Sequence, residues 1–244
     1  MDLRRWLEKE LLRLAAQGEA TAIGWLALVA ARSEKELFPR SLALLRRFLQ
    51  DDPFRYHRNA GALAVARWLA DRCKLALPED FERRYEQLLE EAFGLVALRS
   101  ACVLLDAAQI YLIAHAVPES LKPSFLALLR QERQGRPYRR IIFAEALRLH
   151  EPSAERPDFE LDRLDTQDLI AYGWQHALEG RFNQTLLERT LLASGHYYPL
   201  SKKGPVLHPF LQALLLETLL RYERHLALQD KSRVRSLDAN SRAI

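Results

Sequence analysis

A 25-residue stretch of this chain occurs twice, 84 residues apart, and this duplication constrains the fold more than any single residue does. Pro39–Leu63 aligns without a gap with Pro123–Leu147. Twelve of the 25 aligned pairs are identical: Pro39/Pro123, Leu42/Leu126, Ala43/Ala127, Leu44/Leu128, Leu45/Leu129, Arg46/Arg130, Gln50/Gln134, Pro53/Pro137, Arg55/Arg139, Ala60/Ala144, Ala62/Ala146 and Leu63/Leu147. A repeat at a fixed spacing is typical of stacked supersecondary units, each of which buries its apolar face against the next.

Apolar residues recur with helical spacing along almost the whole chain, and no segment alternates as a strand would. The predicted helices begin near Asp2, Glu19, Ser33, Asp51, Pro78, Ala97, Pro118, Pro137, Thr166, Arg181 and Pro209. An offset of 84 residues then corresponds to two helical hairpins of 42 residues each. The sequence predicts an all-α fold without a sheet, a right-handed α-solenoid of about five to six antiparallel hairpins and about 11 helices.

Four parts are predicted along the chain. Residues 1–150 form the helical repeats, and 151–165, with two prolines and several acids, form a linker. Residues 166–230 form a C-terminal hairpin and a capping or interface helix, and 231–244 form a disordered basic tail.

The junction inside the first copy points to a known class of repeat. Residues 51–63, DDPFRYHRNAGAL, resemble the junction of HEAT repeats, where an acidic turn precedes an arginine and a second helix rich in small residues. The second copy, 135–147, lacks the acidic pair. The resemblance to HEAT/armadillo-type repeats lies at the level of the fold and covers about 110 residues. It implies a protein-binding scaffold or adaptor, although the class also contains DNA-binding members such as alkylpurine DNA glycosylases.

The net charge of +4 gives only weak support for binding to nucleic acid. Three of these charges lie in the last fourteen residues, so residues 1–230 carry only +1. Cys73 and Cys102 have no metal-binding pattern around them, and no metal or cofactor is predicted. The N-terminus lacks a signal peptide, and the longest uncharged run, Ala20–Ala31, is too short to cross a bilayer. We therefore expect a cytoplasmic protein that does not associate with a membrane.

No motif of a common catalytic class occurs, and no catalytic residue is predicted. Asp106 is unusual because it lies within the apolar run 101–116. It is either ion-paired with a neighbouring helix or a functional acid, since a buried carboxylate is costly unless it is paired or used. The sequence leaves enzymatic activity open and favours a protein without it.

Two sets of side chains are candidates for binding a partner or phosphate. The repeated turns carry Arg55, His57 and Arg58 in the first copy and Arg136, Arg139 and Arg140 in the second. Equivalent turns of a solenoid lie along one edge, so these arginines could bind phosphates or an acidic protein segment. Alternatively, the arginines bond the C-termini of the preceding helices and turn acids such as Asp51 and Asp52, and so hold the stack together. This alternative fits the first copy better than the second, where the acids are missing. The second set is in the loop 195–209 and consists of His196, Tyr197, Tyr198, Lys202 and Lys203. These residues either stack on bases and hold phosphates or cover the end of the helical stack.

The last helix is apolar on two sides. Its second side carries Ala213, Leu216 and Leu220. A helix of this kind either tucks into the body or meets another chain, and the second arrangement is favoured. The favoured function is a non-enzymatic scaffold or adaptor that binds a protein partner or self-associates through the last helix. The alternative is a nucleic-acid-binding protein, with a role like that of the DNA-repair glycosylases, that uses the arginine edge and the 195–209 loop.

Overall fold

The computed structural model describes residues 3–33, 36–97, 107–131, 135–195 and 207–241, and these residues form eleven α-helices and no strand. The all-α prediction is therefore confirmed for this part of the chain. The α-helices are α1 (Leu3–Ala16), α2 (Ala20–Ser33), α3 (Phe38–Gln50), α4 (Ala60–Cys73), α5 (Phe81–Ala97), α6 (Ala107–Ile113), α7 (Lys122–Gln131), α8 (Pro137–Arg148), α9 (Thr166–Leu178), α10 (Gln184–Gly195) and α11 (Pro209–Ser241). Three short 3₁₀ turns accompany them: η1 (Pro53–Arg55), η2 (His57–Asn59) and η3 (Leu161–Arg163). None of the described helices is long and apolar enough to cross a membrane.

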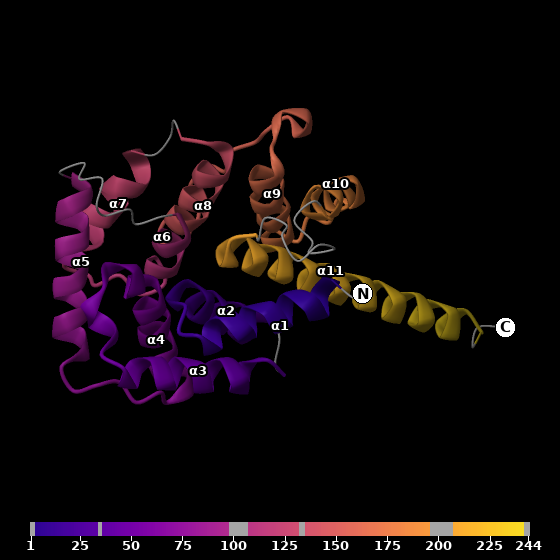
Figure 1. Ribbon diagram of the computed structural model, residues 1–244. Helices are drawn as coiled ribbons and strands as arrows, with labels where there is room; N and C mark the ends of the chain where they lie inside the picture. Colours follow the sequence, from indigo (N-terminus) through magenta and orange to yellow (C-terminus); the bar gives the residue numbers. More distant parts are fainter. Residues whose placement is uncertain (1–2, 34–35, 98–106, 132–134, 196–206, 242–244) are drawn as a thin grey trace.

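Every second helix of the first eight belongs to one packed row. Helices α2, α4, α6 and α8 contact one another in succession, while α1 and α3 pack on α2, α5 packs on α4 and α7 packs on α8 (Figure 1). The two sequence copies are the pairs α3–α4 and α7–α8. Pro39 and Pro123 are each the second residue of their helix, where a missing N–H costs nothing, and Leu45 and Leu129 are both buried.

The two copies differ after their second proline. In the second copy Pro137 opens α8 directly, whereas in the first copy η1 and η2 precede α4. Asp52 lies in the left-handed region of the backbone at φ 45°, and the side-chain amide of Asn59 donates to the carbonyl of Pro53 at 2.7 Å. These local interactions hold residues 53–59 in tight turns, so α4 begins later than residue 51, where the sequence predicts it.

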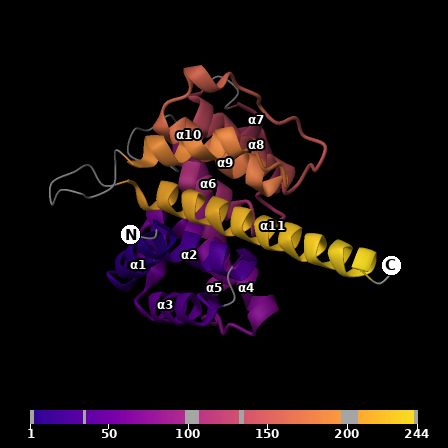
Figure 2. The same ribbon diagram turned by 90° about the vertical axis from the view of Figure 1, so that its right-hand side faces the viewer.

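Helices α9 and α11 close the row. Helix α8 packs on α9, α9 on α11, and α11 on both α1 and α2, so α11 passes between the N-terminal helices and α9 (Figures 1 and 2). Stacked and edge-on rings join Trp25 of α2, Tyr111 of α6, Trp174 of α9 and Phe210 of α11, with centroids 4.9–6.2 Å apart. We call these four residues the aromatic centre. Helices α9 and α11 thus lie against the row formed by α2, α4, α6 and α8.

The three residues predicted to form an interface on the last helix are buried within the chain. Ala213 and Leu216 are fully buried and Leu220 is 5% exposed within the single chain, because one side of α11 meets α1 and α2 while the other meets α9. The helix tucks into the body, which is the alternative that the sequence left open. It also continues to Ser241, beyond the predicted start of the tail at residue 231.

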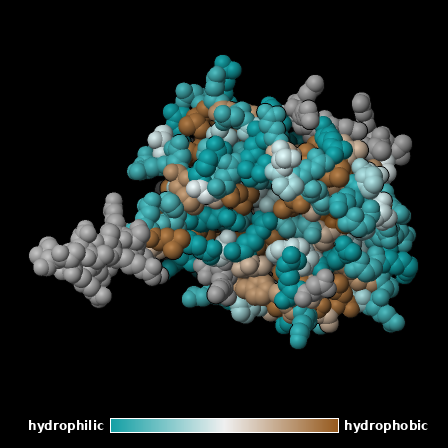
Figure 3. All heavy atoms as spheres, turned by 180° about the vertical axis from the view of Figure 1, so that it is seen from behind, coloured by the Kyte–Doolittle hydropathy of each residue, from teal (hydrophilic) through white to brown (hydrophobic). Residues whose placement is uncertain are grey.

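The remaining surface offers no large apolar face in the view from behind. Hydrophobic residues there form small, separate patches among hydrophilic ones (Figure 3).

Candidate binding site

The arginines of the first copy lie around an exposed tyrosine. Tyr56, between η1 and η2, is 46% exposed, and the guanidinium groups of Arg55 and Arg58 lie 5.5 and 4.9 Å from the centre of its ring. Arg47, at the end of α3, is also exposed, and it lines one groove together with Arg55, Tyr56 and Arg58. We call these four residues the arginine–tyrosine surface. Its three arginines make no ion pair within the part of the chain that the structure describes.

This surface borders a groove of about 380 Å³. The turn between α1 and α2, the end of α3 and the turns η1 and η2 form its walls. Asp51 and Asp52 also line it, but Asp52 binds Arg84 of α5 at 2.6 Å rather than Arg55 or Arg58. The sequence left open whether the turn acids neutralise these arginines, and the observed partner of Asp52 leaves the guanidinium groups available.

The turn that carries Arg58 is held from below. Gln109 of α6 is 4% exposed; its side-chain amide donates to the carbonyl of Arg58 at 2.5 Å, and its carbonyl accepts from the N–H of Gly61 at 2.7 Å. His57, also predicted as a site residue, contacts Glu91 of α5 at 3.4 Å. The exposed surface therefore stands on a rigid base, which limits the entropy that a bound partner would cost.

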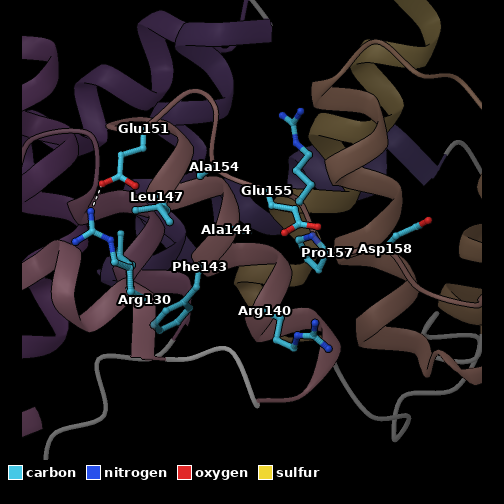
Figure 4. Close-up of a pocket in the computed structure, with 12 residues that line it drawn as sticks. Arg130, Arg140, Phe143, Ala144, Leu147, Glu151, Ala154, Glu155, Pro157 and Asp158 are labelled. Atoms are coloured by element: carbon cyan, nitrogen blue, oxygen red, sulfur yellow. Dashed lines mark hydrogen bonds and ion pairs between the residues drawn. The ribbon is translucent and has the colours of Figure 1, made fainter.

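The second set of arginines has different surroundings. Arg139 stacks on Phe143 and Arg140 on Phe159, at 5.5 and 5.0 Å. Arg140 also lines a pocket of about 420 Å³ between α7, α8 and residues 151–158 (Figure 4). Carboxylates share this pocket: Glu151, which pairs with Arg130, and also Glu155 and Asp158.

The two arginine sets do not come together. Turns η1 and η2 pack on α2, α3, α4 and α5, whereas α8 packs on α6, α7 and α9. Arg136, the remaining member of the second set, is exposed. His196, Tyr197, Tyr198, Lys202 and Lys203 lie outside the described residues, as does Asp106.

The structure reveals a second polar site at one end of the aromatic centre, which we call the axial pocket. It measures about 420 Å³ and is bounded by α2, α6, α8, α9, α11 and the segment after α8. Its lining consists of Arg32, Tyr111, Glu145, Arg148, Leu149, Pro152, Arg156, Leu178 and Arg221.

A buried ion cluster forms one wall of the axial pocket. Glu217 of α11 is fully buried; it accepts from the indole N–H of Trp174 at 2.8 Å and from Arg221 at 2.8 Å, and it lies 3.8 Å from Arg32. Burial alone would raise the pKa of Glu217, but the guanidinium groups of Arg32 and Arg221 hold it below its ordinary value. Arg32 also donates to the hydroxyl of Tyr111 at 3.0 Å.

A second ion cluster also borders the axial pocket. Arg156 donates two hydrogen bonds to Glu145, at 2.6 and 3.2 Å, and lies 2.8 Å from Glu179. Burial would lower the pKa of Arg156, but the bonds to Glu145 and the charge of Glu179 raise it. Both clusters thus consist of arginines fixed by carboxylates.

Sequence reasoning missed the axial pocket, although a signal existed. Glu145 and Glu217 lie within apolar helical runs, as Asp106 does, and a carboxylate in such a run needs a partner. The partner of Glu145, Arg156, comes from the segment after α8, and Arg32 reaches Glu217 only because α11 returns to α2. No local pattern reveals either contact. No group of side chains suited to hold a metal ion occurs among the described residues.

No family model, curated protein or solved structure matches this chain.

Proposed function

We propose that the protein is a cytoplasmic, non-enzymatic scaffold or adaptor whose first eight helices are HEAT-like hairpins wound as a right-handed solenoid. It binds an acidic, extended segment of a protein partner on the arginine–tyrosine surface. The resemblance of residues 51–63 to HEAT-repeat junctions and the alternating packing of α1–α8 support the architecture. One observation carries the function: Arg55 and Arg58 bracket the exposed ring of Tyr56 without any ion pair among the described residues.

The chemistry of this surface suits carboxylates. Guanidinium groups bind carboxylates bidentately, and Tyr56 supplies apolar area beside them. The groove of about 380 Å³ has room for side chains of such a segment. Each charge-assisted hydrogen bond contributes about 1.5–3 kcal/mol, so two arginines account for a useful affinity without a large apolar interface.

Nucleic acid is the second candidate, and one observation favours it. An exposed tyrosine flanked by arginines can stack on a base while the arginines hold phosphates. Against it, the two arginine sets lie on separate parts of the fold, and the second set is beside carboxylates. A nucleic acid needs a continuous basic path, and these facts favour the protein segment.

Fluorescence anisotropy tests the proposal. A labelled glutamate-rich decapeptide with one phenylalanine is titrated with the full chain, alongside a labelled single-stranded oligonucleotide at two salt concentrations. We expect the peptide to bind, and the double variant R55E/R58E to bind it at least tenfold more weakly, because two attractive charges become repulsive.

The matched control is R83E/R163E, which reverses two charges at side chains that are 72% and 81% exposed and form only local surface pairs. This control should bind the peptide as the wild type does. Equal affinity of R55E/R58E and the control would refute the proposed surface. Tighter binding of the oligonucleotide, with an affinity that falls steeply with salt, would establish the second candidate instead.

A further inference from the structure

Several guanidinium nitrogens at the axial pocket have no hydrogen-bond partner among the described residues. Arg221 uses Nε and Nη2 for Glu217, and Arg156 uses Nε and Nη2 for Glu145. In both, Nη1 remains without a hydrogen-bond acceptor among the described residues. Arg148 uses only Nη1, which donates to the carbonyl of Ala154 at 2.6 Å. Each of these three arginines lines the same cavity and has N–H donors that no described residue uses.

These donors are held in place before any ligand arrives. The carboxylates of Glu217 and Glu145 fix Arg221 and Arg156, and they are 0% and 5% exposed. The side chains of Arg156 and Arg221 are each 26% exposed, so they are neither free to rotate in water nor sealed from it. A ligand that binds here does not need to order long side chains, which ordinarily costs about 0.5–1.5 kcal/mol for each one.

Net charge alone does not make this an anion site. Glu145 belongs to the lining, Glu179 and Glu217 lie behind it, and α8 and α9 end here, where helix C-termini carry partial negative charge. These groups offset much of the positive charge of the four arginines in the lining. What favours an anion is the set of donors: three arginines that line one cavity have N–H groups without an acceptor among the described residues, and a compact anion with several oxygens supplies acceptors.

We propose that the axial pocket binds the phosphate group of a small organic phosphate. Phosphate offers three acceptor oxygens and up to two negative charges, which match the donors of Arg148, Arg156 and Arg221. Leu149, Pro152 and Leu178 line the same cavity and give the organic part of the ligand an apolar wall. The volume of about 420 Å³ exceeds what phosphate alone needs and falls in the range of small-molecule sites. This site is separate from the arginine–tyrosine surface, and its existence does not depend on the proposed function.

Isothermal titration calorimetry tests the site with two probes, inorganic phosphate and phenyl phosphate, in a chloride buffer of constant ionic strength. We expect both to bind the full chain, and phenyl phosphate to bind at least threefold more tightly because its ring contacts the apolar wall. The variant R148Q should weaken both at least tenfold. Arg148 bonds only a backbone carbonyl, so its replacement leaves no buried carboxylate without its partner.

Two further variants keep the test decisive. R163Q removes an exposed arginine elsewhere and should leave both affinities unchanged. L149E places a carboxylate on a residue that is 42% exposed at the rim, so it preserves the fold while it repels the anion, and it should weaken both probes as R148Q does. No heat of binding with either probe, or equal affinities in the wild type, R148Q and L149E, would overturn the proposal.

Discussion

Replacing Gly61 by alanine should destabilise the protein, although the same change stabilises most helices. Gly61 is the second residue of α4 and faces α6. A Cβ atom there would lie 2.7 Å from the side-chain oxygen of Gln109 and 2.9 and 3.1 Å from Cδ1 and Cβ of Leu112. The Cβ of Leu112 is fixed to its helix, so α4 and α6 would have to separate.

The magnitude follows from three contributions. Overpacking of a close contact costs about 1–3 kcal/mol. Displacement of Gln109 weakens its 2.7 Å bond from the N–H of Gly61, which costs about 1 kcal/mol. Alanine regains up to about 1 kcal/mol because it restricts the unfolded chain and favours the helix. The net effect of G61A is a loss of about 2 kcal/mol, or a fall in Tm of about 4–8 °C for a chain of this size.

Urea unfolding followed by circular dichroism measures this loss. The control is G94A in the last turn of α5, where a new Cβ meets nothing within 4 Å and where we expect a gain of about 0.5–1 kcal/mol. Opposite signs for the two alanine substitutions support the close approach of α4 and α6. If G61A is as stable as G94A, the packing of this helix pair described above is wrong.

Three further predictions concern the interior. The variant E217Q should lower the free energy of unfolding in urea by about 3–5 kcal/mol, because Arg32 and Arg221 would lose the buried carboxylate that pairs with both. A decrease of less than about 1 kcal/mol would contradict the ion cluster. Burial, followed by the charge of Arg32, lowers the pKa of His115 to about 3, so the unfolded chain binds a proton from pH 6.5 downward while the folded chain does not. Stability should therefore fall by up to about 2 kcal/mol between pH 6.5 and 5, and H115Q should flatten this part of the pH profile. The variant L216A should lower the free energy of unfolding of the monomer by about 2–5 kcal/mol, because Leu216 is fully buried within the chain. A monomeric L216A variant as stable as the wild type would indicate instead that this face of α11 meets another chain.

The sequence predicts what repeats and periodicity control. The duplicated segment correctly pairs α3 with α7, and Pro39 and Pro123 occupy the same helical position. Helical spacing of apolar residues also predicts the all-α class and about 11 helices, because an apolar stripe at this spacing marks the side of a helix that is buried. These features depend on residues close together in the chain.

The features that the sequence does not reveal depend on contacts between distant segments. The late start of α4 depends on the bond from Asn59 to Pro53. The pattern of polar and apolar residues from Asp51 onward fits a longer helix equally well. The two apolar sides of α11 indicate a sandwiched helix but do not say whether the second partner is α9 or another chain. The axial pocket is invisible for the same reason, since Arg32 and Glu217 meet only when α11 returns to α2.

For the candidate site, too, the sequence reveals the local features and not those that depend on distant segments. The pattern of residues 55–58 identifies Arg55 and Arg58, and both lie on the exposed turn. It cannot tell that Asp52 binds Arg84 instead of these arginines, because α5 supplies that partner from outside the repeat. Nor does it distinguish the first arginine set from the second, where residues 151–158 bring carboxylates beside Arg140.

The chemical shifts of the ¹⁵N-labelled chain, recorded as the acidic decapeptide is added, show directly whether an acidic segment binds the arginine–tyrosine surface. We expect the amide signals of residues 47 and 55–58 to move with a single saturation curve, while the signals of residues that line the axial pocket stay in place. Shifts confined to residues 136–140 or to the axial pocket, or no shifts at saturating peptide, would contradict the account.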